Sequence, residues 1–138
     1  MRLARLGLLA TLIAVVIGAA PLKAQQRVDV ALVLAADVSR SITTDEFQLQ
    51  RQGYAKAIAD PDVVHAIQAG IHGAVALTFV EWAGPEEQQV VVDWQIIRDP
   101  ASAKQFTETL LAPPRAFYGR TSISAALDFA MARLKAHG

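Results

Sequence analysis

The feature that most constrains the fold is the stretch VDVALVLAADVSRSIT, residues 28–43. Its first nine residues, 28–36, form a nearly continuous run of Val, Leu and Ala. Such a run predicts a strand buried on both faces, and strands of this kind usually lie in parallel sheets with helices on either side. The run ends abruptly in Asp37, Ser39 and Ser41. The stretch therefore predicts an α/β fold with polar side chains beyond the carboxyl end of its first strand.

Four later segments are expected to be helical. Thr43 stands three residues before Glu46, which is the spacing of a capping box. An Asp followed by Pro, at residues 60–61 and again at 99–100, places a cap before the first helical position. A last helix is expected after residue 122. The apolar residues expected to share helix faces are Phe47, Tyr54 and Ile58; Ala103, Phe106 and Leu110; and Ile123, Ala126, Leu127, Ala130 and Leu134.

Two more strands are expected between these helices. GAVALTFVEW, residues 73–82, and QQVVVDWQII, residues 88–97, are close enough to pair antiparallel through the intervening GPEE turn. The segment APPRAFYGRTS, residues 112–122, predicts an irregular loop. We expect Trp82 to be packed and Glu81 to be a surface charge.

The N-terminus predicts export. Arg2 and Arg5 precede an apolar run over residues 6–20, and small residues follow. This is the layout of a secretory signal peptide, with cleavage expected after Ala24 and an uncleaved membrane anchor as the alternative. The run is shorter than the roughly 20 residues that a membrane span needs, so no stable span is expected after cleavage. The mature protein is expected to be periplasmic or secreted.

Cleavage would remove three of the thirteen Lys/Arg and leave 114 residues, with ten Lys/Arg against thirteen Asp/Glu. That is enough chain for one small domain, without a basic stripe, so nucleic acid is not an expected partner. The chain contains no cysteine. No disulfide can therefore stabilise the exported protein, and no thiol can bind metal or act as a nucleophile.

Asp37, Ser39 and Ser41 offer only oxygen ligands, which suit Mg²⁺ or a similar hard cation rather than zinc or copper. Their spacing of two residues lets a tight turn direct alternate side chains to one point. Two structural alternatives stay open. The serines can satisfy main-chain groups in a turn, and Asp37 can cap a helix.

The sequence DVSRS after an apolar strand resembles the D-x-S-x-S motif of von Willebrand factor type A domains. YGRTSISAAL resembles the Thr loop of that family, with Arg120 in place of its second Gly, so the resemblance implies Thr121 as a third hydroxyl ligand. ALTFVEWAG and GRTSISAALDFA further resemble the bacterial exported branch called domain of unknown function 1194. The resemblance covers residues 28–136.

In that family the motif forms a metal-ion-dependent adhesion site. The resemblance implies a non-catalytic, exported protein-binding module that holds Mg²⁺, or alternatively Mn²⁺ or Ca²⁺, through Asp37, Ser39, Ser41 and Thr121. It implies a protein partner whose acidic side chain completes the metal site.

The resemblance also implies a Rossmann-like von Willebrand factor type A fold that is incomplete. Residues 1–24 are read as the signal peptide and 25–138 as the N-terminal part of the domain, with three strands and helices on both faces. The strand that would supply a last acidic ligand has no counterpart. We expect the first strand to lack a neighbour on one side and the protein to self-associate or fold incompletely.

A rival interpretation is a fragment of a subtilisin-like serine hydrolase, since Asp37, His72 and Ser122 follow the chain order Asp, His, Ser. The sequences around His72 and Ser122 depart from the motifs of that family, and only 50 residues separate these two. We therefore expect a binding module rather than an enzyme, with His65 and His72 as surface or structural residues.

Overall fold

The computed structural model describes residues 26–137, so the expected signal peptide lies outside the described residues. The elements are β1 (Val30–Asp37), α1 (Thr44–Ile58), α2 (Pro61–Gln68), β2 (Val75–Trp82), β3 (Gln88–Ile97), α3 (Pro100–Leu111) and α4 (Ile123–His137). The predicted order of strands and helices is confirmed.

The three strands form one mixed sheet in the order β1-β2-β3. β1 runs parallel to β2 in a register that starts at Val30 opposite Val75 and ends at Asp37 opposite Trp82. β3 pairs antiparallel with β2, as the short turn between them predicts. Because β1 and β2 end side by side, the segments that follow Asp37 and Trp82 leave the sheet at the same edge.

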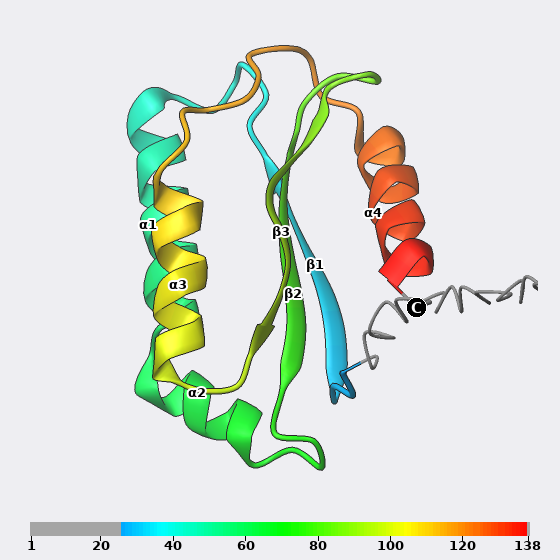
Figure 1. The fold of residues 1–138 in the computed structure, drawn as a ribbon. Helices are drawn as coiled ribbons and strands as arrows, with labels where there is room; N and C mark the ends of the chain where they lie inside the picture. The colour runs from blue at the N-terminus through cyan, green and yellow to red at the C-terminus, as the bar shows by residue number, and fades with distance from the viewer. Residues whose placement is uncertain (1–25, 138) are drawn as a thin grey trace, which may run out of the picture.

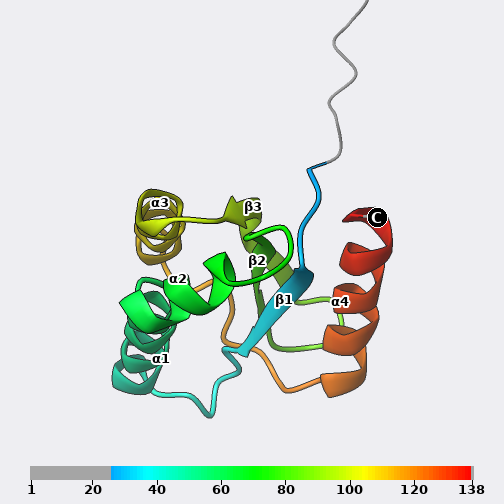
Figure 2. The same ribbon diagram turned by 90° about the horizontal axis from the view of Figure 1, so that it is seen from below.

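Helices cover both faces of the sheet (Figure 1). α1, α2 and α3 lie on one face and α4 lies on the other, and the view from below in Figure 2 shows the same division. The main core lies under the first three helices. Tyr54 of α1 meets Phe79 of β2 edge to face, with ring centroids 5.0 Å apart. The buried members of this core are Ala36, Ala55, Ile58, Val64, Leu77, Phe79, Val92, Ile97, Ala103, Phe106 and Leu110.

Local capping chemistry starts the first three helices where the sequence predicts. Thr43 and Glu46 form a reciprocal capping box at α1. Asp60 accepts a hydrogen bond from the main-chain N–H of Asp62 at the start of α2. At α3 the N-cap is Asp99, which also forms a capping box, with Ser102. Each cap satisfies N–H groups that the first helical turn leaves without partners.

The prediction that β1 is buried on both faces is wrong for the part of the chain that the structure describes. Among residues 26–137, β1 is an edge strand with β2 as its one neighbour, which agrees with the expectation that the first strand lacks a neighbour on one side. Val30, Leu32 and Ala35 are exposed, and 44% of Leu32 is accessible to solvent. The apolar run predicts that these side chains suit an interior. It does not show which elements cover each face of the strand. The self-association expected of such an edge stays a prediction.

The apolar residues expected to share one face of α4 are mostly exposed. Of these five residues, only Ala126 is buried, and Ile123, Leu127 and Leu134 are exposed. α4 contacts β3 through polar and aromatic groups. Arg133 forms an ion pair with Asp93 of β3. His137 stacks on Trp94 with ring centroids 4.1 Å apart.

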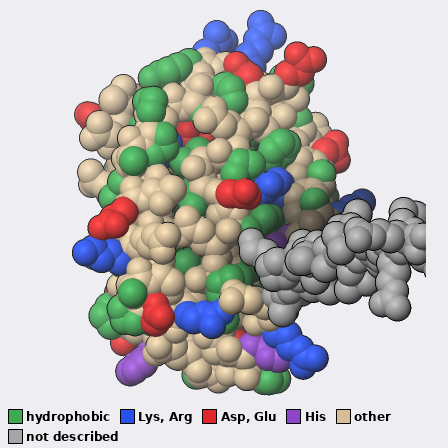
Figure 3. Space-filling model, viewed as in Figure 1, with side chains coloured by type: hydrophobic (Ala, Val, Ile, Leu, Met, Phe, Trp, Pro, Cys, Tyr) green, Lys and Arg blue, Asp and Glu red, His purple; other side chains and the backbone are tan. Residues whose placement is uncertain are grey.

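The surface on the side shown in Figure 3 mixes residue types. Lys and Arg are interspersed with Asp and Glu, and apolar side chains lie between them. Among residues 26–137, no helix has both the length and the apolar character needed to cross a bilayer.

Leu110 and Leu111 give a matched test of the core under α3. Leu110 is fully buried, whereas Leu111, the next residue, is 50% exposed. We expect Leu110→Ala to lower the free energy of unfolding by about 2–5 kcal/mol, because it removes buried methyl groups and leaves a cavity. Leu111→Ala should change it by less than about 1 kcal/mol. Urea denaturation followed by circular dichroism measures both, and equal losses would contradict the assigned burial.

Asp29 gives the fold a predictable response to acid. Its carboxylate accepts hydrogen bonds from the main-chain N–H groups of His72 and Ala74, at 2.8 and 3.2 Å, and ties the start of β1 to the segment before β2. The bond from His72 is the main reason that the pKa of Asp29 lies below its usual value. The stabilisation is therefore fully present above the unfolded-state pKa and is lost as the pH falls through the lower, folded-state value.

We expect the urea midpoint of Asp29→Asn to fall less steeply than that of the wild type between about pH 5 and pH 2, because the variant has lost this titration. Asp128→Asn is the matched control, since Asp128 is exposed on α4. An unchanged slope in Asp29→Asn would contradict the assignment.

Candidate metal centre

The candidate site begins where β1 ends. Val38 donates its main-chain N–H to the Trp82 carbonyl, at 2.9 Å, and so extends the pairing of β1 and β2 by one step. The chain then turns. Ser39 donates its N–H to Asp37 Oδ1 at 2.7 Å, and Ile42 donates its N–H to the Ser39 carbonyl at 2.9 Å. These local bonds close a tight turn at the carboxyl end of the strand, where open α/β sheets bind ligands.

The structure brings the three predicted hydroxyl groups together in this turn. Thr121 Oγ1 donates to Ser39 Oγ at 2.9 Å, although the two residues are 82 positions apart in the chain. Ser39 Oγ and Ser41 Oγ lie 3.3 Å apart. Ser39 is buried, whereas Asp37 is half-buried and the other two are exposed. The cluster is thus fixed on its inner side and open to solvent on its outer side.

Main-chain bonds hold the Thr121 segment against this turn. Arg40 donates its N–H to the Gly119 carbonyl at 2.9 Å, and Ser122 donates its N–H to the Ala83 carbonyl at 2.7 Å. A side chain at position 119 would meet the carboxylate of Glu87, which would have to move aside. Residues 119–122 are therefore held between the turn after β1 and the turn after β2.

The donor set fits a hard cation. Neighbouring oxygens in an octahedral Mg²⁺ shell are about 2.9 Å apart, since each lies about 2.0–2.1 Å from the metal. The separation of 2.9 Å between the Thr121 and Ser39 hydroxyls equals that spacing, and the separation of 3.3 Å between Ser39 and Ser41 is somewhat longer. The residues that would hold the ion are Asp37, Ser39, Ser41 and Thr121. Residues 26–137 contain no cluster of three or more His, Cys, Asp or Glu side chains placed to bind a metal, so this set is distinguished by its hydroxyls.

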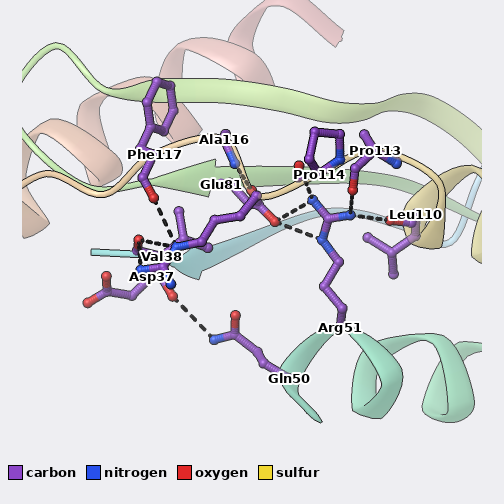
Figure 4. Close-up of polar contacts among 11 residues, drawn as sticks. Asp37, Val38, Gln50, Arg51, Glu81, Leu110, Pro113, Pro114, Ala116 and Phe117 are labelled. Carbon is purple, nitrogen blue, oxygen red and sulfur yellow. Dashed lines mark hydrogen bonds and ion pairs between the residues drawn. The ribbon is translucent and has the colours of Figure 1, made fainter. Parts of the chain in front are cut away.

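A buried ion pair lies beside the site (Figure 4). Glu81 is fully buried, which overturns its predicted role as a surface charge, whereas Trp82 is packed as predicted. Arg51 of α1 donates to Glu81 Oε1 through Nε at 2.8 Å and approaches it through Nη2 at 2.6 Å. Arg51 Nη1 also donates to the carbonyls of Leu110 and Pro113, each at 2.7 Å. The pair therefore joins α1 and β2 to the end of α3.

Glu81 has a second partner in the loop. Its Oε2 accepts the main-chain N–H of Ala116 at 2.9 Å (Figure 4). Arg51 Nη2 reaches the Pro114 carbonyl at 3.3 Å. An irregular segment has few partners of its own for its main-chain groups. Here two buried side chains from regular elements supply them.

A second buried arginine, Arg115, lies in the same loop and was not among the residues singled out from the sequence. Its guanidinium group donates to main-chain carbonyls of the turn after β1, including that of Val38. Gln50 of α1 also reaches this turn, with Nε2 3.5 Å from the Asp37 carbonyl (Figure 4). The turn is therefore contacted from α1 as well as from the loop.

The residues of the rival hydrolase interpretation do not converge. Asp37 and Ser122 lie at the carboxyl end of β2, because they neighbour Trp82 and Ala83. His72 precedes the other end of β2, where its main-chain N–H is bound by Asp29. An eight-residue strand is about 25 Å long, so His72 is far from both residues. His65 is exposed on α2, as predicted.

The buried pair supplies a test of the loop's support. We expect Glu81→Gln to lower the free energy of unfolding by about 3–5 kcal/mol, because Arg51 would stay buried without a countercharge. The matched control is Glu108→Gln, which breaks a 3.7 Å pair with Lys104 on the surface of α3. That change should cost less than about 1 kcal/mol, since both partners are solvated. Urea denaturation compares the two, and equal losses would contradict the structural role of Glu81.

Comparison with known families places the chain. No curated protein matches its sequence closely enough to be reported as a relative. A family model described as protein of unknown function (DUF1194) matches residues 27–138. The match begins just before β1 and includes every helix and strand of the structure. The chain therefore belongs to the DUF1194 family.

Proposed function

We propose that the protein is an exported metal-ion-dependent adhesion module that binds a protein partner through a divalent cation. The observation that carries this proposal is the convergence of Ser39, Ser41 and Thr121 beside Asp37 at the carboxyl end of β1. Three hydroxyls and one carboxylate are all oxygen ligands, which suit Mg²⁺ and, less selectively, Mn²⁺ or Ca²⁺.

The charge of the site supports a binding role. One carboxylate offsets only half of the charge of a divalent cation, so the ion keeps an attraction for a further anionic ligand. The outer side of the cluster is open, since Ser41 and Thr121 are exposed. A carboxylate from a protein partner can approach the ion from this side. The resemblance to von Willebrand factor type A domains supports the same mode of binding.

Two further parts of the proposal rest on the sequence. The N-terminal charged and apolar pattern of residues 1–24 supports export to the periplasm or the outside of the cell. A role in binding rather than catalysis is supported by the composition of the site, which holds three hydroxyls and one carboxylate, whereas His72 lies near the opposite end of β2.

Titration calorimetry with Mg²⁺ and Mn²⁺ tests the metal site. We expect the wild type to bind with a dissociation constant of about 10⁻⁴–10⁻³ M, since Mg²⁺ gives up its water reluctantly and the site has one carboxylate. Asp37→Ala should abolish the binding heat, because it removes the one anionic ligand.

Asp128→Ala is the control for general loss of negative charge, since it removes an exposed carboxylate from α4 and should leave the heat unchanged. Equal heats for the wild type and Asp37→Ala would overturn the metal site. Labelling of Ser122 by a fluorophosphonate probe, with no effect of a chelator, would instead favour a serine hydrolase.

A further inference from the structure

The side chain of Arg115 binds the turn after β1 from inside. It is only 9% exposed. All of its hydrogen bonds are to main-chain carbonyls: Val38 at 3.1 Å from Nε and 2.6 Å from Nη2, Ser39 at 2.7 Å from Nη2, Ile42 at 2.8 Å from Nη1, and Phe117 at 2.9 Å from Nε. One guanidinium group thus holds three carbonyls of the segment that carries the proposed metal ligands.

This arginine is buried without a carboxylate. Within the described residues, Asp and Glu form ion pairs with Arg51, Lys104 and Arg133, and none does so with Arg115. Its charge is offset instead by the carbonyl dipoles and by aromatic faces. The guanidinium carbon lies 4.4 Å from the ring centroid of Tyr118 and 5.7 Å from that of Phe47. A buried charge of this kind depends on the surrounding carbonyls, because no carboxylate of the described residues is paired with it. If one of these carbonyls moved away, part of the buried charge would be left without a partner.

We propose that Arg115 is a positioning residue for the metal site. By drawing the carbonyls of Val38, Ser39 and Ile42 inward, it fixes the main chain of the turn so that the hydroxyls of Ser39 and Ser41 meet that of Thr121. This inference rests on the proposed metal-binding function, but the effect of Arg115 on the turn can be measured without metal.

The geometry of the contacts requires arginine. The bonds leave three different nitrogens and diverge to carbonyls on both sides of the turn. A guanidinium group holds its donors in a rigid plane, whereas a lysine ammonium is a single point charge on a flexible stem. Arg115→Lys therefore keeps the charge and loses most of the shape of the contact.

The rest of the loop is anchored independently of these bonds. Pro113 and Pro114 are bound by Arg51, and Ala116 is bound by Glu81. The residues before and after Arg115 are therefore both held in place, and they position its side chain against the turn. A lysine at this position should leave the loop in place and loosen mainly residues 38–42.

Two measurements on the purified protein test the proposal. The first is Mn²⁺ affinity, from the electron paramagnetic resonance signal of the free ion. We expect Arg115→Lys to bind Mn²⁺ about 10–100-fold more weakly, as when groups that orient metal ligands are altered. The second is amide hydrogen exchange without metal. The amides of Val38, Ser39, Arg40 and Ile42 all have acceptors in the wild type and should exchange faster in the variant.

The control is Ile97→Val, which removes a buried methylene from the opposite end of the sheet, where Ile97 pairs with Val75. It should leave Mn²⁺ affinity and the exchange of residues 38–42 unchanged. An equal effect in the control would overturn the proposal, because general destabilisation would then explain both results. Unchanged exchange in Arg115→Lys would also overturn it, even if affinity fell, since the weaker binding would then not arise from a loosened turn.

If the wild type binds no Mn²⁺, the proposed function is wrong. The effect of Arg115 on the turn is then still tested by hydrogen exchange without metal. Faster exchange confined to residues 38–42 in Arg115→Lys would support that action, and unchanged exchange would exclude it.

Discussion

The ion pair between Arg51 and Glu81 is the interaction on which the arrangement of the loop beside the site depends. Burying two charges costs several kcal/mol per ion unless their remaining hydrogen-bonding groups find partners. Here those partners are carbonyls and one N–H of the loop that follows α3, including Pro113 and Ala116. The pair and the loop therefore stabilise each other. Residues 112–122 contain no helix or strand. They nevertheless take one defined path, because another path would leave the buried charges of Arg51 and Glu81 without hydrogen-bond partners.

The consequence is a site built by two loops with different supports. The turn after β1 is closed by local bonds, such as that from Ser39 to Asp37. The segment that ends at Thr121 is placed by contacts far apart in the chain. Arg115 connects the two, since it lies in the second loop and binds the first. The hydroxyl cluster therefore forms where two segments meet. The turn after β1 is stabilised by local hydrogen bonds, whereas the loop that ends at Thr121 is held by contacts between residues far apart in the chain.

This difference explains what the sequence could predict. The caps at Thr43 and Asp99 and the turn between β2 and β3 depend on neighbours within a few residues, and they were found where the sequence placed them. Glu81 was misjudged because its partner is 30 residues away. A signal existed, since Arg51 falls at helical spacing among Phe47, Tyr54 and Ile58, and a charge on an apolar helix face indicates a buried pair. The loop around Arg115 has no periodicity that could have identified it. Periodicity likewise marked the apolar residues of β1 and α4 without showing what lies against them.

The buried charges also bear on what the proposed site would bind. The buried charged residues are two arginines, Arg51 and Arg115, and one carboxylate, that of Glu81, so the buried charges of the described residues include an excess positive charge. Water screens such charges less than it screens exposed ones. The excess would weaken the binding of a free cation at Asp37 and strengthen the attraction of the filled site for an anion. Such a site would bind a free cation weakly, but a bound cation could link the protein to an anionic group of a partner. These electrostatics would support the proposed acidic protein partner, since its carboxylate would be attracted both by the ion and by the buried positive charge.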